Sequence, residues 1–152
     1  MDINYIVTLA EKSRMKKIKI LMILFLTVSS TILFSQTLRD GKGIKVGTIE
    51  NGIVRNGQGQ KIASYDEHNI IRDQRGVKTS SIDNGTIRNE KGIKTGVIDQ
   101  NGTVRNAQGL KIGSIDGKGI VRNGKGMKIG SADGIPIKIV AWFYFFKTNN
   151  YE

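Results

Sequence analysis

The sequence contains no cysteine, one histidine and one proline in 152 residues. Without cysteine, disulfide bonds, thiol catalysis and thiolate metal ligands are excluded. A single imidazole, His68, also leaves zinc sites and Ser-His catalysis without the parts they need, so we interpret His68 as a solvated turn residue. Nineteen glycines beside one proline favour many tight turns over disorder or a collagen-like chain. The composition thus predicts a small, turn-rich domain with no metal and no cofactor.

Long apolar runs are scarce, and the first covers residues 20–34, directly after the basic residues Lys16, Lys17 and Lys19. A basic stretch, an apolar stretch and a small or polar ending are the parts of a secretory signal peptide. The run is short for a bilayer span and contains four Ser or Thr residues, although an uncleaved membrane anchor is the competing interpretation.

We predict that residues 15–35 are the signal peptide, that Met15 is the natural start, and that residues 1–14 are a mis-called extension. Cleavage at the end of this segment leaves a repeat domain at residues 36–147 and a tail at residues 148–152. The predicted location is secreted, periplasmic or at the cell surface, with no membrane span once the signal peptide is removed.

Charge of one sign dominates, because 24 Lys and Arg residues outnumber 13 Asp and Glu residues and give a formal net charge of +11. Residues 1–35 carry five basic and two acidic residues, which leaves about +8 on residues 36–152. Such an excess attracts polyanions over a long range, although it also serves simply to keep a small protein soluble.

An internal repeat of 16–17 residues runs from residue 37 onward in about six copies. Each copy has an aliphatic residue, an arginine, an Asn or Asp, a glycine three residues later, a lysine, a small residue and a closing acid. The arginine column is Arg39, Arg55, Arg72, Arg88, Arg105 and Arg122. The lysine column is Lys45, Lys61, Lys78, Lys94, Lys111 and Lys128. The acidic column is Glu50, Asp66, Asp83, Asp99, Asp116 and Asp133.

Each copy predicts a short β-hairpin. Triplets such as Thr-Val-Arg alternate outward and inward side chains, as a half-buried strand does. Asn-x-x-Gly then turns the chain, since Asn tolerates a left-handed backbone and Gly supplies positive φ. In the second strand the alternation breaks at a small residue, where we expect a bulge or bend that lets backbones approach closely. The small column is Gly47, Ala63, Ser80, Gly96, Gly113 and Gly130.

The connections between copies and the segment that follows the last copy complete the predicted fold. Asn-Gly pairs at residues 51–52, 84–85 and 101–102 predict two-residue hairpin returns. One hairpin cannot bury its apolar face alone, so the copies must stack as a linear β-solenoid or close into a ring. Residues 139–146 are apolar or aromatic throughout, which predicts a strand buried on both faces that closes the ring; a docking or oligomerisation strand is the competing interpretation.

The predicted fold class is therefore all-β, with repeated hairpins and a closing aromatic strand. The pattern resembles the five-fold β-flower family of exported bacterial proteins. The resemblance rests on G-x-I-R-N-x-x-G-x-K-I-G-x-I-D units, as in Gly102 to Asp116, and on Gly134-Ile135-Pro136 before the aromatic segment. It implies petal-like hairpins around a pseudo-five-fold axis and implies no activity. The sequence has six arginine-bearing copies rather than five. If each unit is instead taken from its second strand to the first strand of the next copy, five complete strand pairs remain.

The residues predict a non-catalytic protein. The acids recur at one equivalent position in every copy, which is typical of a ladder that pairs with the Arg or Lys columns rather than of a glycosidase-like carboxylate pair. We predict an exported structural or binding module, without catalytic residues, whose partner is a glycan or protein at the cell surface. The alternative is polyanion binding, to a glycan or nucleic acid, through the lysine column. Nucleic acid is the less favoured ligand, since the repeats lack base-stacking aromatics apart from Tyr65.

Overall fold

The computed structural model describes residue 12, residues 14–16 and residues 36–147. The chain divides into two compact units, Met1–Leu33 and Phe34–Glu152. The described residues of the first unit are helical. Most of the proposed extension and signal peptide, and the tail, lie outside the described residues, so those boundaries stay predictions. Within the described part of the chain, no helix is both long enough and apolar enough to cross a membrane.

The second unit is built from short antiparallel strands. The strands of residues 36–147 are β1 (Gln36–Asp40), β2 (Lys45–Glu50), β3 (Ile53–Asn56), β4 (Lys61–Tyr65), β5 (Ile70–Asp73), β6 (Lys78–Asp83), β7 (Thr86–Asn89), β8 (Lys94–Ile98), β9 (Thr103–Asn106), β10 (Lys111–Ile115), β11 (Ile120–Asn123) and β12 (Lys128–Ala132). Each strand pairs with its neighbours in the sequence, and β1 pairs with β12 to close the ring. The all-β hairpin fold is therefore confirmed, and the linear solenoid is excluded.

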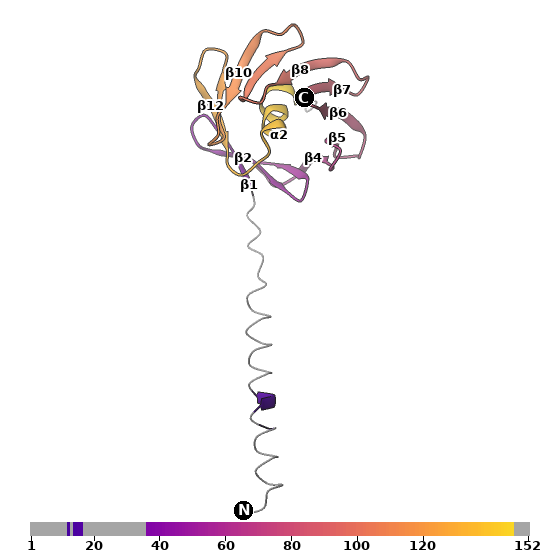
Figure 1. Ribbon diagram of the computed structural model, residues 1–152, viewed down its shortest axis with the longest axis vertical. Helices are drawn as coiled ribbons and strands as arrows, with labels where there is room; N and C mark the ends of the chain where they lie inside the picture. The colour runs from indigo at the N-terminus through magenta and orange to yellow at the C-terminus, as the bar shows by residue number, and fades with distance from the viewer. Residues whose placement is uncertain (1–11, 13, 17–35, 148–152) are drawn as a thin grey trace, which may run out of the picture. The chain divides into compact units, whose positions relative to one another are not determined.

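The ring contains six hairpins in these residues rather than the five that the resemblance implies. Each hairpin joins an arginine-bearing strand to the following lysine-bearing strand, so every arginine copy seen in the sequence forms its own petal (Figure 1). The pairing of Leu38 with Ala132 and of Arg39 with Ser131 forms the seam between the first and last petals. The count of arginine copies was thus the better guide to the number of petals.

Successive connections in such a ring alternate between its two ends. The Asn-x-x-Gly turns after β1, β3, β5, β7, β9 and β11 therefore all lie at one end, which we name the tip end. The loops after β2, β4, β6, β8 and β10, with the residues that follow β12, lie at the opposite end, which we name the return end. Topology alone thus gathers six equivalent turns on one side of the domain.

The aromatic segment before the tail is helical, which corrects the predicted closing strand. Residues 137–146 form α2 (Ile137–Ala141) and the π-helical turn η1 (Trp142–Phe146). Figure 1 shows α2 inside the ring of hairpins. A closed ring leaves no free strand edge, so a segment inside it must satisfy its own backbone hydrogen bonds, which a helix does. Apolar residues all around the segment are what a helix surrounded by protein requires.

The core lies between the ring and this helical plug. The aliphatic residue before each arginine is fully or almost fully buried, as the alternation predicted: Leu38, Val54, Ile71, Ile87, Val104 and Val121. A second inward set lies near the return end: Ile49, Ile82, Ile98, Ile115 and Ala132. From the plug, Ile139, Val140, Ala141 and Trp142 are buried against them.

The small column has a role that the sequence disclosed only in part. A bulge is present in all six hairpins, one residue before the small position; in the first, Leu38 faces Gly47 while Arg39 faces Lys45, so Val46 is the extra residue. A Cβ at Gly113 would collide with the Phe145 ring as well as with a neighbouring carbonyl oxygen. Three of the small residues, Gly96, Gly113 and Gly130, are thus sockets for aromatic rings, whereas Gly47 is a point of close backbone approach to the Arg55 carbonyl.

Each socket receives its own ring of the plug. A Cβ on Gly96 would meet Phe146, and one on Gly130 would meet Tyr144. At the equivalent position of the third petal, the Ser80 hydroxyl accepts a hydrogen bond from the Trp142 indole at 3.3 Å. Tyr144, Phe145 and Phe146 therefore dock on the sixth, fifth and fourth petals, and Trp142 docks on the third.

The return loops have two lengths. Asn51-Gly52 and Asn84-Gly85 form the predicted two-residue returns, with positive φ at both residues of each pair. The pair at residues 101–102 does not, because β8 ends at Ile98 and the loop covers four residues. There the Gly102 amide donates to the Asp99 carbonyl instead.

Candidate functional site

The tip turns share one hydrogen-bond pattern in all six petals. The side-chain oxygen of the Asn or Asp accepts from the backbone amides two and four residues later at 2.9–3.1 Å. The glycine amide donates to the carbonyl of the same Asn or Asp. Within the described residues the glycine has positive φ and the Asn or Asp does not, so the predicted left-handed Asn is corrected: its side chain acts as an acceptor. The six tips therefore share one hydrogen-bonded turn.

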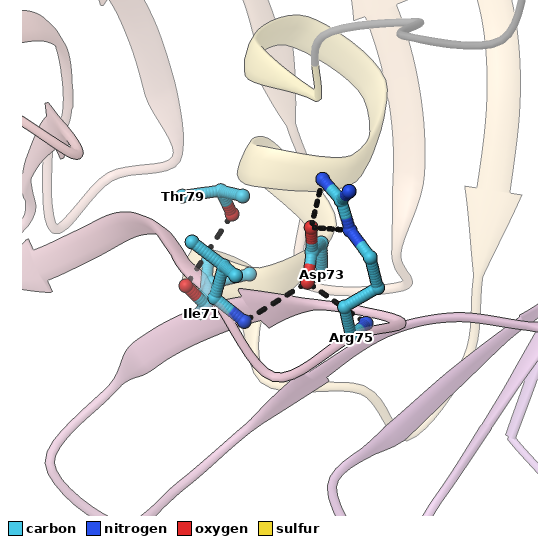
Figure 2. Close-up of polar contacts among 5 residues, drawn as sticks. Ile71, Asp73, Arg75 and Thr79 are labelled. Atoms are coloured by element: carbon cyan, nitrogen blue, oxygen red, sulfur yellow. Dashed lines mark hydrogen bonds and ion pairs between the residues drawn. The ribbon is translucent and has the colours of Figure 1, made fainter.

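Figure 2 shows one such turn, in the third petal. The Asp73 carboxylate accepts from the backbone amides of Arg75 and Val77 and pairs with the Arg75 guanidinium at 3.4 Å. The hydrogen bond from the Val77 amide is the largest cause that lowers the pKa of Asp73. Behind the turn, the Thr79 hydroxyl donates to the Ile71 carbonyl at 3.3 Å.

The arginine column braces the tips. In five petals the guanidinium donates to the carbonyl oxygen of the turn glycine at 3.0–3.4 Å: Arg39 to Gly43, Arg55 to Gly59, Arg88 to Gly92, Arg105 to Gly109 and Arg122 to Gly126. A carbonyl acceptor satisfies one N–H group but does not neutralise the charge. Apart from Arg105, which also pairs with the Asp99 carboxylate at 3.2 Å, the braced arginines therefore still present positive charge at the tip end.

The predicted lysine site residues lie directly opposite these arginines. The pairs are Arg39–Lys45, Arg55–Lys61, Arg72–Lys78, Arg88–Lys94, Arg105–Lys111 and Arg122–Lys128. Like charges directly opposite each other destabilise a sheet, so this arrangement is not explained by stability. Lys61 is half-buried and the other five lysines are exposed.

Basic and acidic residues occupy opposite ends of the ring. The tip half holds both basic columns and four further exposed cations in the turns: Lys42, Arg75, Lys91 and Lys125. Its acids are Asp40, Asp73 and Glu90. The return loops, the strand ends beside them and the residues after β12 hold Glu50, Asp66, Glu67, Asp83, Asp99, Asp116 and Asp133, against Lys118 in a loop and Lys138 in α2. The repeat therefore makes one end strongly basic and the other acidic.

This separation corrects the predicted charge ladder, of which one rung is present: Arg105 of the arginine column pairs with Asp99 of the acidic column. Among the described residues the ion pairs are Arg75–Asp73 and Arg105–Asp99. Of the acidic column, Asp66 and Asp116 instead accept backbone amides within their own return loops. The spacing of the columns could have disclosed this result, because the bases flank the Asn-x-x-Gly turn and the acids adjoin the other connection.

The tips also carry apolar side chains that the sequence reasoning did not single out. The residue after the turn glycine is aliphatic in five petals and 57–66% exposed: Ile44, Val77, Ile93, Leu110 and Met127. In the second petal this position is Gln60, whose side chain accepts a hydrogen bond from Asn56. An apolar residue in five of the six turns, directly before the lysine column, was the pattern that could have revealed them.

The remaining candidates carry no evident chemistry. His68 is exposed in a return loop, where its backbone amide donates to Asp66. Within residues 12, 14–16 and 36–147, no cluster of His, Cys, Asp or Glu could hold a metal ion. Near the end of the plug, the Lys147 ammonium lies 4.8 Å from the centroid of the Phe143 ring, and burial lowers the pKa of Lys147.

Comparison with known proteins agrees with this architecture. Neither the curated proteins nor the solved structures yield a match to the chain. Residues 35–147 match the family described as 5-fold beta-flower protein. The match spans every described strand and the helical plug. The chain therefore belongs to the 5-fold beta-flower protein family.

Proposed function

We propose that this chain is an exported, non-catalytic binding module whose tip end binds extended polyanions. The separation of charge between the two ends carries the proposal. A net charge spread evenly over a surface serves solubility, but a field of one sign concentrated on one face attracts and orients a partner of the opposite sign. Because the cations stand on six equivalent turns, they match a ligand with repeated negative charges better than a single small anion.

The family and the residues support a non-catalytic role. The family is not a known enzyme family. The tip turns consist mainly of exposed cations, amides and aliphatic residues. Of their three carboxylates, those of Asp40 and Asp73 accept backbone amides within their own turns, and Glu90 is exposed. We favour an anionic glycan or another repeated anionic surface over single-stranded nucleic acid, since binders of the latter stack bases on aromatic side chains.

The test uses heparin as a model polyanion and a variant with all six column lysines replaced by glutamine. Since each cation that contacts a polyanion releases counterions, about six such contacts would reduce affinity by about a thousandfold between 50 and 200 mM salt. We expect the wild-type chain to bind with such salt dependence and the variant to bind weakly with a shallower salt slope. Calorimetry over a salt series measures both quantities.

The matched control is Lys118→Gln at the return end. It removes the one base of the return loops, so heparin binding should remain unchanged. Failure of the wild-type chain to bind at low salt would overturn the proposal. A loss of binding in Lys118→Gln equal to that in the single column variant Lys111→Gln would show that net charge, and not its position, is responsible.

A further inference from the structure

We propose that the tip end docks on anionic lipid surfaces, its aliphatic residues inserting between headgroups while the flanking cations bind lipid phosphates. The proposal rests on the proposed function, since it names one class of polyanionic surface. It requires that apolar and cationic side chains share one face, because interfacial binding combines burial of apolar side chains with electrostatic attraction.

The tip end meets the apolar requirement. Soluble proteins expose single apolar residues commonly, but here exposure recurs at one position of a turn. Ile44, Ile93 and Leu110 are about 60% exposed, as are Val77 and Met127. The turn pattern requires only the backbone amide and carbonyl of this position, so hydrogen bonding does not explain an aliphatic side chain.

The second petal shows that the fold does not require these side chains. Gln60 occupies the same position with the same backbone hydrogen bonds, its amide donating to Asn56 at 2.9 Å. The turn therefore folds with a polar residue, and the aliphatic choice in the other five petals is an additional property of the surface. This petal also provides a substitution that the structure already accommodates.

The cations are placed to reach headgroup phosphates. Each aliphatic residue is followed at once by a column lysine, and the arginine opposite that lysine lies in the adjoining strand. An inserted tip would thus carry an ammonium and a guanidinium one residue behind its apolar side chain. Arginine and lysine are the side chains that bind phosphates by charge-assisted hydrogen bonds.

The charge of the tip end argues against a second copy as the occupant. Two tip ends placed face to face would oppose the same basic columns, and like charges brought together across an interface cost several kcal/mol. A free polyanionic glycan would satisfy the cations but would leave the aliphatic residues exposed. An anionic lipid surface satisfies both sets.

The test measures binding of the full chain to vesicles of phosphatidylglycerol mixed with phosphatidylcholine, and to pure phosphatidylcholine vesicles. The variant carries Ile44→Gln, Val77→Gln, Ile93→Gln, Leu110→Gln and Met127→Gln, which copy the second petal. We expect the wild type to prefer anionic vesicles and the variant to bind them about a hundredfold more weakly, as partial burial of five aliphatic side chains implies. Heparin affinity should be unchanged in the variant.

A second measurement locates the contact. In Leu110→Trp, the new indole should be quenched by brominated acyl chains, whereas an indole placed at the return end by Gly117→Trp should not. Because both variants share the same N-terminal segment, a difference between them reports on the two ends of the ring.

The outcomes separate the two proposals. Equal vesicle binding by wild type and the glutamine variant, with heparin binding retained, would overturn lipid docking and leave polyanion binding standing. Loss of heparin and vesicle binding in the wild type would overturn both. A wild-type dimer in sedimentation that the glutamine variant abolishes would assign the apolar tips to a second copy instead.

Discussion

The ring of strands and the helical plug use apolar residues in different ways. Every petal repeats the same buried aliphatic residue, the same bulge and the same tip turn. The plug has no internal repeat, and four of its five aromatic residues each meet a different petal: Trp142 meets Ser80, Tyr144 meets Gly130, Phe145 meets Gly113 and Phe146 meets Gly96. The repeat therefore determines the shape of each petal, whereas the plug makes the petals distinct and fills the space that they enclose.

Removing the plug should have the largest effect on the stability of the domain. A chain that ends at Gly134 loses the buried residues Ile139, Val140 and Trp142, each of which contributes about 1.5–3 kcal/mol through burial. Since a domain of this kind has about 5–15 kcal/mol of total stability, we expect no cooperative unfolding transition in circular dichroism. Ile137→Ser, at the exposed start of α2, is the control and should unfold cooperatively. A truncated chain that melts cooperatively would show that the ring is stable without its plug.

Filling one socket should give the next largest effect. Gly113→Ala places a methyl group against the Phe145 ring and the Arg122 carbonyl, and overpacking of this kind costs about 1–3 kcal/mol. Gly117→Ala is the matched control, since nothing lies within 4 Å of its new methyl group. Urea denaturation measures both. Adding Phe145→Leu to Gly113→Ala should recover part of the loss; no recovery would mean that the carbonyl, and not the ring, limits the site.

The plug also secures the seam of the ring through Tyr144. Its hydroxyl lies 2.6 Å from the Arg39 carbonyl in β1 and 3.1 Å from the Ser131 carbonyl in β12. We expect Tyr144→Phe to lower the free energy of unfolding by about 1 kcal/mol at neutral pH, the usual net value of one such hydrogen bond. Thermal unfolding at pH 7 tests this expectation, and an unchanged stability would show that the hydroxyl adds nothing to the seam.

The same tyrosine should produce a pH dependence. Burial raises the pKa of Tyr144 to about 12, above the value near 10 of an unfolded chain. Its neutral form is therefore favoured in the folded state, so its contribution is complete below pH 10 and is lost as the pH rises toward 12. Urea midpoints between pH 8 and 12 should fall less steeply in Tyr144→Phe than in the wild type. Burial also raises the pKa of Tyr65, which adds to the slope that remains, and lowers the pKa of Lys147, which acts in the opposite direction.

The smallest effect should come from the tip turns, because their pattern tolerates Asn and Asp alike. Asp73→Asn keeps the acceptor for the Arg75 and Val77 amides and removes an exposed ion pair, so the melting temperature at pH 7 should hardly change. Hydrogen bonding lowers the pKa of Asp73, so its contribution exists above the unfolded pKa and is lost as the pH falls through the folded value. The variant should lack that part of the acid dependence. A large loss at pH 7 would show that the ion pair matters.

The sequence predicted the ring well because its determinants are local and repeated. Each copy contains its own alternation, turn residues and bulge position, and six repetitions average out single irregularities such as the second petal. The plug was predicted as a strand because residues 139–146 lack a polar face, and periodicity cannot separate a buried strand from a buried helix in so short a run. The closed ring leaves no free strand edge with which residues 139–146 could pair, so this segment forms a helix.

The candidate site was predictable as a set of residues but not as a surface. The basic and acidic columns were visible in the sequence, yet their separation follows from an alternation of hairpin ends that exists only once the strands are paired. The exposed aliphatic tips were missed for a related reason. An apolar residue beside a turn glycine is expected to start the next buried strand, and only the bulge explains why burial begins later.

Each tip turn has two positions that maintain its backbone conformation and two that vary from petal to petal. The Asn or Asp and the glycine recur in all six petals, whereas the two residues between them vary as Gly-Lys, Gly-Gln, Gln-Arg, Glu-Lys, Ala-Gln and Gly-Lys. Such a ring is multivalent by construction. When one tip is engaged, the others stand at high effective concentration over the same partner, so weak single contacts combine into strong avidity. The domain would therefore bind a partner surface that repeats an anionic group more tightly than one isolated anionic group, although each tip alone binds weakly.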